Sequence, residues 1–149
     1  LLPQTYMSAF MEELVAVLLK NSNLLPAQRI HVRLASNFNM PPAFKATFYP
    51  EAESCKVPFV SKTICAYQLQ DGEPVLAMAM FCQEYGNDAP AGNKRRVYVA
   101  YLDTAAYLDT APNLAPGPAR TATYQAMLQA YLARVQPRGF TAAHIRLHP

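Results

Sequence analysis

Two long apolar segments joined by a tight-turn dipeptide constrain the fold of this chain more than any other feature of its sequence. Residues 57–69 and 74–85 are both rich in strand-forming side chains, and Asp71-Gly72 lies between them. Asp-Gly is a preferred pair for the two-residue turns that link adjacent antiparallel strands, so the sequence predicts a β-hairpin. The second arm contains the apolar run Val75–Cys82, which predicts a central strand covered on both faces.

A second unit follows the hairpin. The pattern predicts, in order, a strand (97–102), a proline-rich loop (103–119), a helix (120–136) and a strand (140–147). A helix that connects two strands of one sheet brings the second strand back parallel to the first. The predicted fold is therefore α/β (α+β), with a mixed central sheet, a β-hairpin and a strand–loop–helix–strand crossover.

The remaining segments are shorter or less regular. Apolar residues at helical spacing predict an amphipathic helix over 6–20, and alternation predicts a short strand from Ile30 to Leu34. Residues 36–56 contain three prolines and predict irregular structure, and residues 86–93 predict a loop. We assign residues 1–149 to one domain.

The composition is that of a folded domain. Hydrophobic residues make up 52% of the chain and charged residues 15%, which excludes disorder, and the longest apolar run is too short to cross a bilayer. A net charge of +3 is too small to indicate direct nucleic-acid binding. Cys55, Cys65 and Cys82 are too dispersed for a zinc site, and His144 with His148 lacks a third ligand, so no metal site is predicted. We expect Cys65 and Cys82 to be buried free thiols, as in a reducing compartment.

The end of one strand and the start of the next helix predict an anion site. Ligands of crossover sheets bind beyond the carboxyl ends of the strands, here Leu102-Asp103-Thr104, and near a helix N-terminus, which we expect at Arg120-Thr121. Such a terminus offers unpaired N–H groups, to which Arg120 adds a two-pronged donor and Thr121 a hydroxyl. These groups are suited to phosphate. The pattern alone leaves the ligand open, since the glycine spacing of dinucleotide and P-loop sites is absent.

Three stretches resemble one known family. Gln83–Pro90 reads QEYGNDAP and Asn93–Thr104 reads NKRRVYVAYLDT, where CREB-binding-protein-type histone acetyltransferases read QEYGSDCP and NQRRVYISYLDS in their catalytic domain. Arg120–Tyr124 reads RTATY, where the family reads RTAVY. The resemblance spans nearly the whole chain, and the loop length is closer to plant members. Because Tyr101–Thr104 recurs as Tyr107–Thr110, we align the family motif with the first copy.

The resemblance implies a histone acetyltransferase that moves an acetyl group from acetyl-coenzyme A (acetyl-CoA) to lysine and regulates transcription in the nucleus. Implied partners are histone tails or other lysine-bearing proteins, with transcription factors bound by regions outside this chain. Neither nucleic acid nor a membrane is expected as a direct partner. The implied cofactor residues are Leu102, Asp103 and Thr104 along the pantetheine arm, Arg120 and Thr121 at the phosphates, and Tyr124 nearby.

Two departures from the family bear on catalysis. The family strand ends HIWACPP, whereas His144–Pro149 reads HIRLHP, so Arg146 replaces a tryptophan that helps to shape the lysine tunnel. A cation there would repel the substrate ammonium group. The family's substrate loop and its tyrosine general acid lie beyond the position of Pro149. The resemblance therefore assigns no catalytic residue here, and we expect the 149 residues alone to lack acetyltransferase activity. The alternative is a non-catalytic remnant or interaction module that keeps part of the cofactor site.

Overall fold

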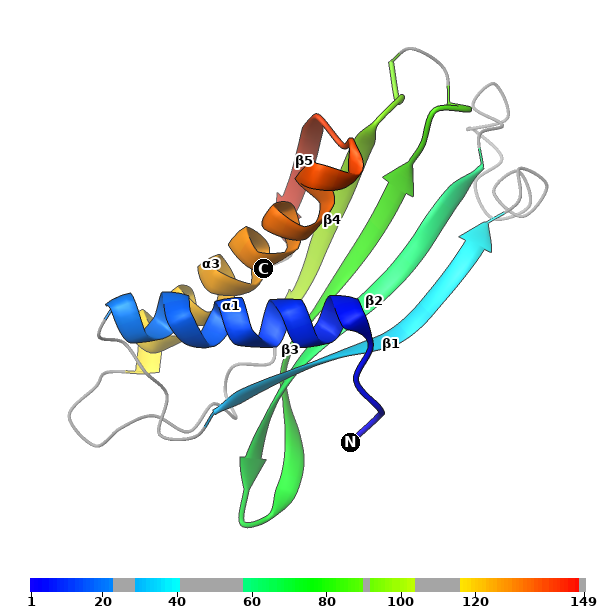
Figure 1. The fold of residues 1–149 in the computed structure, drawn as a ribbon. Helices are drawn as coiled ribbons and strands as arrows, with labels where there is room; N and C mark the ends of the chain where they lie inside the picture. Colours follow the sequence, from blue (N-terminus) through cyan, green and yellow to red (C-terminus); the bar gives the residue numbers. More distant parts are fainter. Residues whose placement is uncertain (23–28, 41–57, 90–91, 104–115, 148–149) are drawn as a thin grey trace.

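A computed structural model describes residues 1–22, 29–40, 58–89, 92–103 and 116–147 of the chain. Five strands form one sheet in the order β1-β2-β3-β4-β5, and two long helices lie against it (Figure 1). The first four strands are antiparallel to their neighbours, and β5 is parallel to β4. The elements are α1 (Tyr6–Ser22), β1 (Ile30–Met40), β2 (Phe59–Gln70), β3 (Glu73–Tyr85), β4 (Arg96–Asp103), α3 (Pro116–Val135), the 3-10 turn η3 (Gln136–Arg138) and β5 (Ala142–Leu147).

This architecture confirms the predicted α/β (α+β) class, the hairpin and the parallel crossover. Strands β2 and β3 pair from Gln70 and Glu73 outwards, so the turn consists of Asp71 and Gly72. Both turn residues have positive φ, 52° and 80°, which matches the twist of the adjoining strands. Glycine adopts this conformation without strain, and aspartate is one of the few other residues that tolerate it.

Two predicted boundaries were wrong. Residues 36–40 belong to β1 and are not irregular, because the pairing shifts by one residue between Leu34 and Ser36 and resumes beyond it. That bulge interrupts the period-two alternation on which the shorter strand was based. Helix α3 begins at Pro116, not at Arg120. Proline is compatible with the first turn of a helix, so the proline-rich segment ends earlier than predicted.

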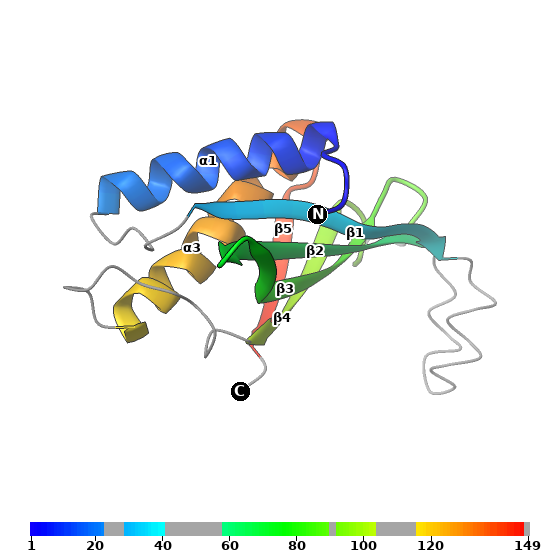
Figure 2. The ribbon, with the colours of Figure 1, turned by 90° about the horizontal axis from the view of Figure 1, so that it is seen from below.

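Both helices pack on the same face of the sheet, as the view from below shows (Figure 2). Met78, Met80 and Cys82 of β3 belong to the core between the sheet and the helices, as does Met11 of α1. The sequence predicted that β3 is covered on both faces, and this was wrong for the face that carries Phe81. Within the described residues no helix lies on that face, and Phe81 is 44% exposed.

The two cysteines that the structure describes, Cys65 and Cys82, are buried free thiols, as predicted. Burial raises the pKa of both thiols, that of Cys82 to about 12, which keeps them protonated and unreactive. None of the described helices is long and apolar enough to span a bilayer.

A buried carboxylate fastens α1 to β1. Glu12 accepts hydrogen bonds from the backbone N–H of Val32 at 2.9 Å and from Nη1 of Arg33 at 2.7 Å, and its side chain is 8% exposed. Arg33 in turn donates to the carbonyl oxygen of Leu2, which holds the N-terminal segment against the strand. Burial by itself would raise the pKa of Glu12, but the Val32 and Arg33 hydrogen bonds lower it below its usual value of 4.5.

We expect this carboxylate to make folding stability depend on pH. Because the pKa of Glu12 is lower in the folded than in the unfolded chain, its stabilisation is present above pH 4.5 and is lost as the pH falls through the folded-state pKa. Glu12→Gln should therefore lower the free energy of unfolding by about 1–3 kcal/mol at neutral pH and by less in acid. Urea unfolding at a series of pH values measures this, with exposed Glu13→Gln as the control. Parallel pH profiles for the two variants would contradict the assignment.

Candidate functional site

Strand β4 ends at the same end of the molecule at which α3 begins (Figure 1). The parallel pairing of β4 with β5 requires this arrangement, because α3 must run back along the sheet before β5 can start. The crossover therefore brings the predicted residues of β4 and α3 to one end of the sheet, as the sequence indicated.

At the end of β4, the described pairing with β5 stops before the pairing with β3. Leu102 and Asp103 pair with Ala79 and Met78 of β3, whereas the last pair between β4 and β5 joins Tyr101 to Leu147. Successive residues of a strand turn their backbone groups to alternate sides, so one of Leu102 and Asp103 faces the β5 side, and within the described residues neither is in register with a residue of β5. A strand end that extends beyond its neighbour is suited to an extended ligand that carries amide groups. The side chains of Leu102 and Asp103, and all of Thr104, lie outside the described part of the chain.

Arg120, Thr121 and Tyr124 lie on the first turns of α3. Thr121 is exposed, Arg120 is partly exposed, and Tyr124 packs in part against the core. Since the helix begins at Pro116, Arg120 lies a full turn inside it, and the prediction that its backbone opens the helix was wrong. Pro116 and Pro118 have no N–H, so anion binding here depends more on side-chain donors than on helix-terminal N–H groups.

A buried polar cluster lies beneath α3. Lys62 of β2 donates to both carboxylate oxygens of Glu84 of β3, at 2.8 and 3.1 Å, and the Tyr131 hydroxyl of α3 donates to Glu84 Oε2 at 2.8 Å. The Lys62 and Glu84 side chains are only 6% and 4% exposed, and Tyr131 is fully buried. Burial raises the pKa of Tyr131 well above its usual value, so its hydroxyl remains a donor.

Sequence reasoning missed this cluster, although the sequence contains a signal for it. Lys62 and Glu84 occupy the same alternating positions as the core residues Ile64 and Cys82, and each lies on the helix-covered face of the hairpin. Two opposite charges at core-facing positions of adjacent strands indicate a buried ion pair.

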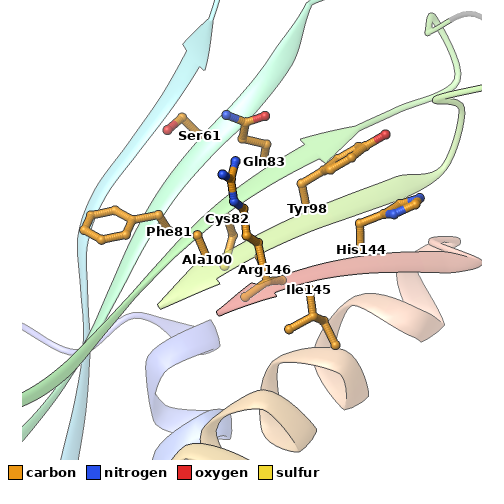
Figure 3. Close-up of a pocket in the computed structure, with 10 residues that line it drawn as sticks. Ser61, Phe81, Cys82, Gln83, Tyr98, Ala100, His144, Ile145 and Arg146 are labelled. Carbon is orange, nitrogen blue, oxygen red and sulfur yellow. The ribbon is translucent and has the colours of Figure 1, made fainter. Parts of the chain in front are cut away.

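The face of the sheet away from the helices has a hollow of about 570 Å³ (Figure 3). A row of rings crosses one end of it, with centroid separations of 5.2 Å for Phe59–Tyr85, 5.4 Å for Tyr85–Tyr98 and 4.9 Å for Tyr98–His144. His144 also contacts Arg96 Nη1 at 2.7 Å through its Nε2. The side chains on this face around the hollow are Ser61, Phe81, Gln83, Tyr98, Ala100, His144 and Arg146.

The rings of Tyr98 and His144 stack with an interplanar angle of 9°, so both side chains have a packing role. Arg146 is exposed and reaches over the hollow (Figure 3). No group of three or more potential metal ligands occurs in the part of the chain that the structure describes. The hollow and the crossover end are thus two separate features, one on the open face and one at the end of the sheet.

Comparison with known proteins identifies the family of the chain. The histone acetyltransferase domain family KAT3 matches residues 19–149. The chain is 38% identical over 105 residues to a probable histone acetyltransferase, HAC-like 3, of Oryza sativa subsp. japonica, a match covering 70% of this chain and 8% of that protein. It is 36% identical over 103 residues to histone acetyltransferase HAC4 of Arabidopsis thaliana, a match covering 68% of this chain and 7% of that protein. It is 38% identical over 90 residues to protein cbp-1 of Caenorhabditis elegans, a match covering 60% of this chain and 4% of that protein.

The chain therefore belongs to the KAT3 histone acetyltransferase domain family, and it spans less than a tenth of the length of these relatives. The family expected from the QEYG and YLD stretches is confirmed. The mixed sheet with its crossover is consistent with an acetyltransferase-like fold.

The buried cluster should be a unit of stability. Lys62→Met leaves the Glu84 charge buried without its cation, and we expect it to lower the free energy of unfolding by about 3–5 kcal/mol. Lys62→Met combined with Glu84→Gln removes that charge while keeping an acceptor for Tyr131, and should recover part of the loss. Urea unfolding followed by circular dichroism measures both. If the double variant is no more stable than Lys62→Met, the uncompensated charge is not the cause of the loss.

Proposed function

We propose that this domain binds acetyl-CoA at the end of the β4–α3 crossover and serves acetyl transfer to lysine side chains of histones or other proteins. One observation carries the proposal: in a chain of the KAT3 family, the crossover brings the end of β4 to the end of the sheet where Arg120 and Thr121 lie. Regulation of transcription in the nucleus, with transcription factors bound outside this chain, belongs to the same proposal.

The donor set fits the chemical parts of the ligand. The pantetheine arm of coenzyme A contains two amides, which are suited to backbone hydrogen bonds at the end of β4, where Leu102 and Asp103 extend beyond the described register with β5. Arg120 carries a fixed positive charge and a planar set of donors for phosphate oxygens, and Thr121 adds an exposed hydroxyl. Thr104 and Tyr124 complete the proposed set, with Tyr124 near the phosphates.

The reaction requires the lysine ε-amine to lose a proton, the amine to attack the thioester carbonyl, and the departing thiolate to be protonated. The chain's described residues supply binding and orientation for this reaction. We assign none of them as the general acid or base, since Tyr131, Cys82 and Glu84 are buried in the core.

Coenzyme A should raise the melting temperature of the protein, because a ligand that binds only the folded state stabilises it. Arg120→Ala should reduce this shift, since a hydrogen bond to a charged group contributes about 1.5–3 kcal/mol. Differential scanning fluorimetry over a range of coenzyme A concentrations measures it.

Arg138→Ala is the matched control, because it removes an exposed arginine in η3, beyond the opposite end of α3. We expect it to keep the full shift. Equal shifts in the Arg120 and Arg138 variants would overturn the site, and the absence of any shift in the unmodified protein would overturn the proposed cofactor.

Arg146 should decide how well a lysine substrate is accepted. Its guanidinium reaches over the hollow where the family has a tryptophan, and a cation there repels an ammonium group (Figure 3). We expect Arg146→Trp to increase the affinity for a lysine-bearing histone peptide in the presence of coenzyme A, and Arg146→Lys to leave it low. Fluorescence anisotropy with a labelled peptide measures both. No gain in Arg146→Trp would favour a domain that binds acetyl-CoA but does not accept lysine.

A further inference from the structure

The Lys62–Glu84–Tyr131 cluster lies in the core under α3, away from the end of the sheet where we place the cofactor. Taking an ion pair out of water costs free energy, and apolar residues of similar volume are often as stable. A hydrogen bond weakens steeply when its angle is changed, whereas apolar packing has no preferred direction. The charged cluster can therefore define the orientation of a helix, which apolar packing alone does not. The cluster is bonded to α3 through Tyr131, and it therefore fixes the orientation of the helix at that residue.

Tyr131 shares a face of α3 with two proposed cofactor residues. Positions 120, 124 and 131 are separated by four and by seven residues, which places them on one stripe of a helix. Arg120 lies roughly 16 Å from Tyr131 along the helix axis, at 1.5 Å per residue. Because the helix is stiff over this length, a rotation or slide of α3 at Tyr131 would also move Arg120 and Tyr124. The orientation set at Tyr131 is the orientation in which the cofactor residues are presented.

The apolar contacts of α3 specify this orientation only in part. The buried apolar residues on the N-terminal side of Tyr131 are Ala126, Met127 and Ala130, and Val135 lies one turn beyond it. Alanine is small and methionine is flexible, so such an interface admits neighbouring rotations at little cost. The 2.8 Å bond from Tyr131 to Glu84 Oε2 selects one of them, and Lys62 holds both oxygens of Glu84 in place.

We infer that Glu84, oriented by Lys62, is a positioning residue for the cofactor site and acts through Tyr131 on the rotation and height of α3. The inference rests on the proposed function, since it concerns how Arg120 and Tyr124 are presented to coenzyme A. It assigns no contact between the buried cluster and the ligand.

Tyr131→Phe tests this directly, because it removes one hydroxyl and keeps the ring that fills the core. Isothermal titration with coenzyme A should give a dissociation constant raised by about fivefold, within the range found for residues that act on a site indirectly. In an Arg120→Ala background, Tyr131→Phe should cause little further loss, because the contact through which it acts is already gone. Ile64→Val, a small core change in β2 that keeps the Tyr131–Glu84 hydrogen bond, is the control for general destabilisation and should leave the affinity unchanged.

Amide hydrogen exchange of the ligand-free protein gives a second measurement. We expect residues 120–124 to exchange faster in Tyr131→Phe than in the unmodified protein, and not in Ile64→Val. The positioning role is overturned if Tyr131→Phe weakens binding equally in both backgrounds, or if it leaves affinity and exchange unchanged while Arg120→Ala still weakens binding. If the unmodified protein does not bind coenzyme A, the proposed function fails, and the exchange comparison still decides whether Tyr131 holds the first turns of α3.

Discussion

Strands β4 and β5 run in the same direction, so the chain must return along the whole sheet between them. This requirement sets the position of α3, because the helix is the segment that makes the return. It also separates the hairpin side of the sheet, where every pairing is antiparallel, from the crossover side, where a helix start and a strand end lie at one end. A site for an extended, phosphate-bearing ligand follows from this arrangement only when the helix presents the appropriate residues.

Each helix is fastened to the sheet by one buried carboxylate. Glu12 of α1 accepts from the backbone of Val32 in β1, and Glu84 of β3 accepts from Tyr131 of α3. In both cases a cation from a strand, Arg33 or Lys62, holds the same carboxylate. Apolar burial supplies most of the driving force for packing but has no direction, whereas these bonds define how each helix is turned. The two helices also pack against each other, so the orientation of one supports that of the other.

The sequence predicted the parts of the fold that depend on local signals. Asp71-Gly72 located the hairpin turn, and the order of strand, helix and strand predicted the parallel pairing. Two boundaries failed because a bulge near Ala35 changes the alternation within β1, and because Pro116 starts a helix that prolines were expected to delay. Arg120 and Thr121 were proposed as site residues from the crossover and the family motif, and Tyr124 from the family motif, but the sequence did not predict the link from Glu84 to Tyr131. That link joins residues 47 positions apart, and only strand register and helix rotation together bring them into contact.

Substitutions on the two faces of the sheet have different consequences. This difference affects which positions of the domain can change within its family. The face under the helices contains the buried carboxylates, so a change there alters packing and the presentation of α3 together. The open face carries Arg146 and Phe81, which are exposed, and His144, whose ring is held by Tyr98 and Arg96. Replacing Arg146 removes no core contact, since its side chain lies over the hollow rather than in the protein interior. The charge of the open face can therefore change without a change in the proposed cofactor end, so under the proposed function acceptance of a lysine substrate would be separable from cofactor binding.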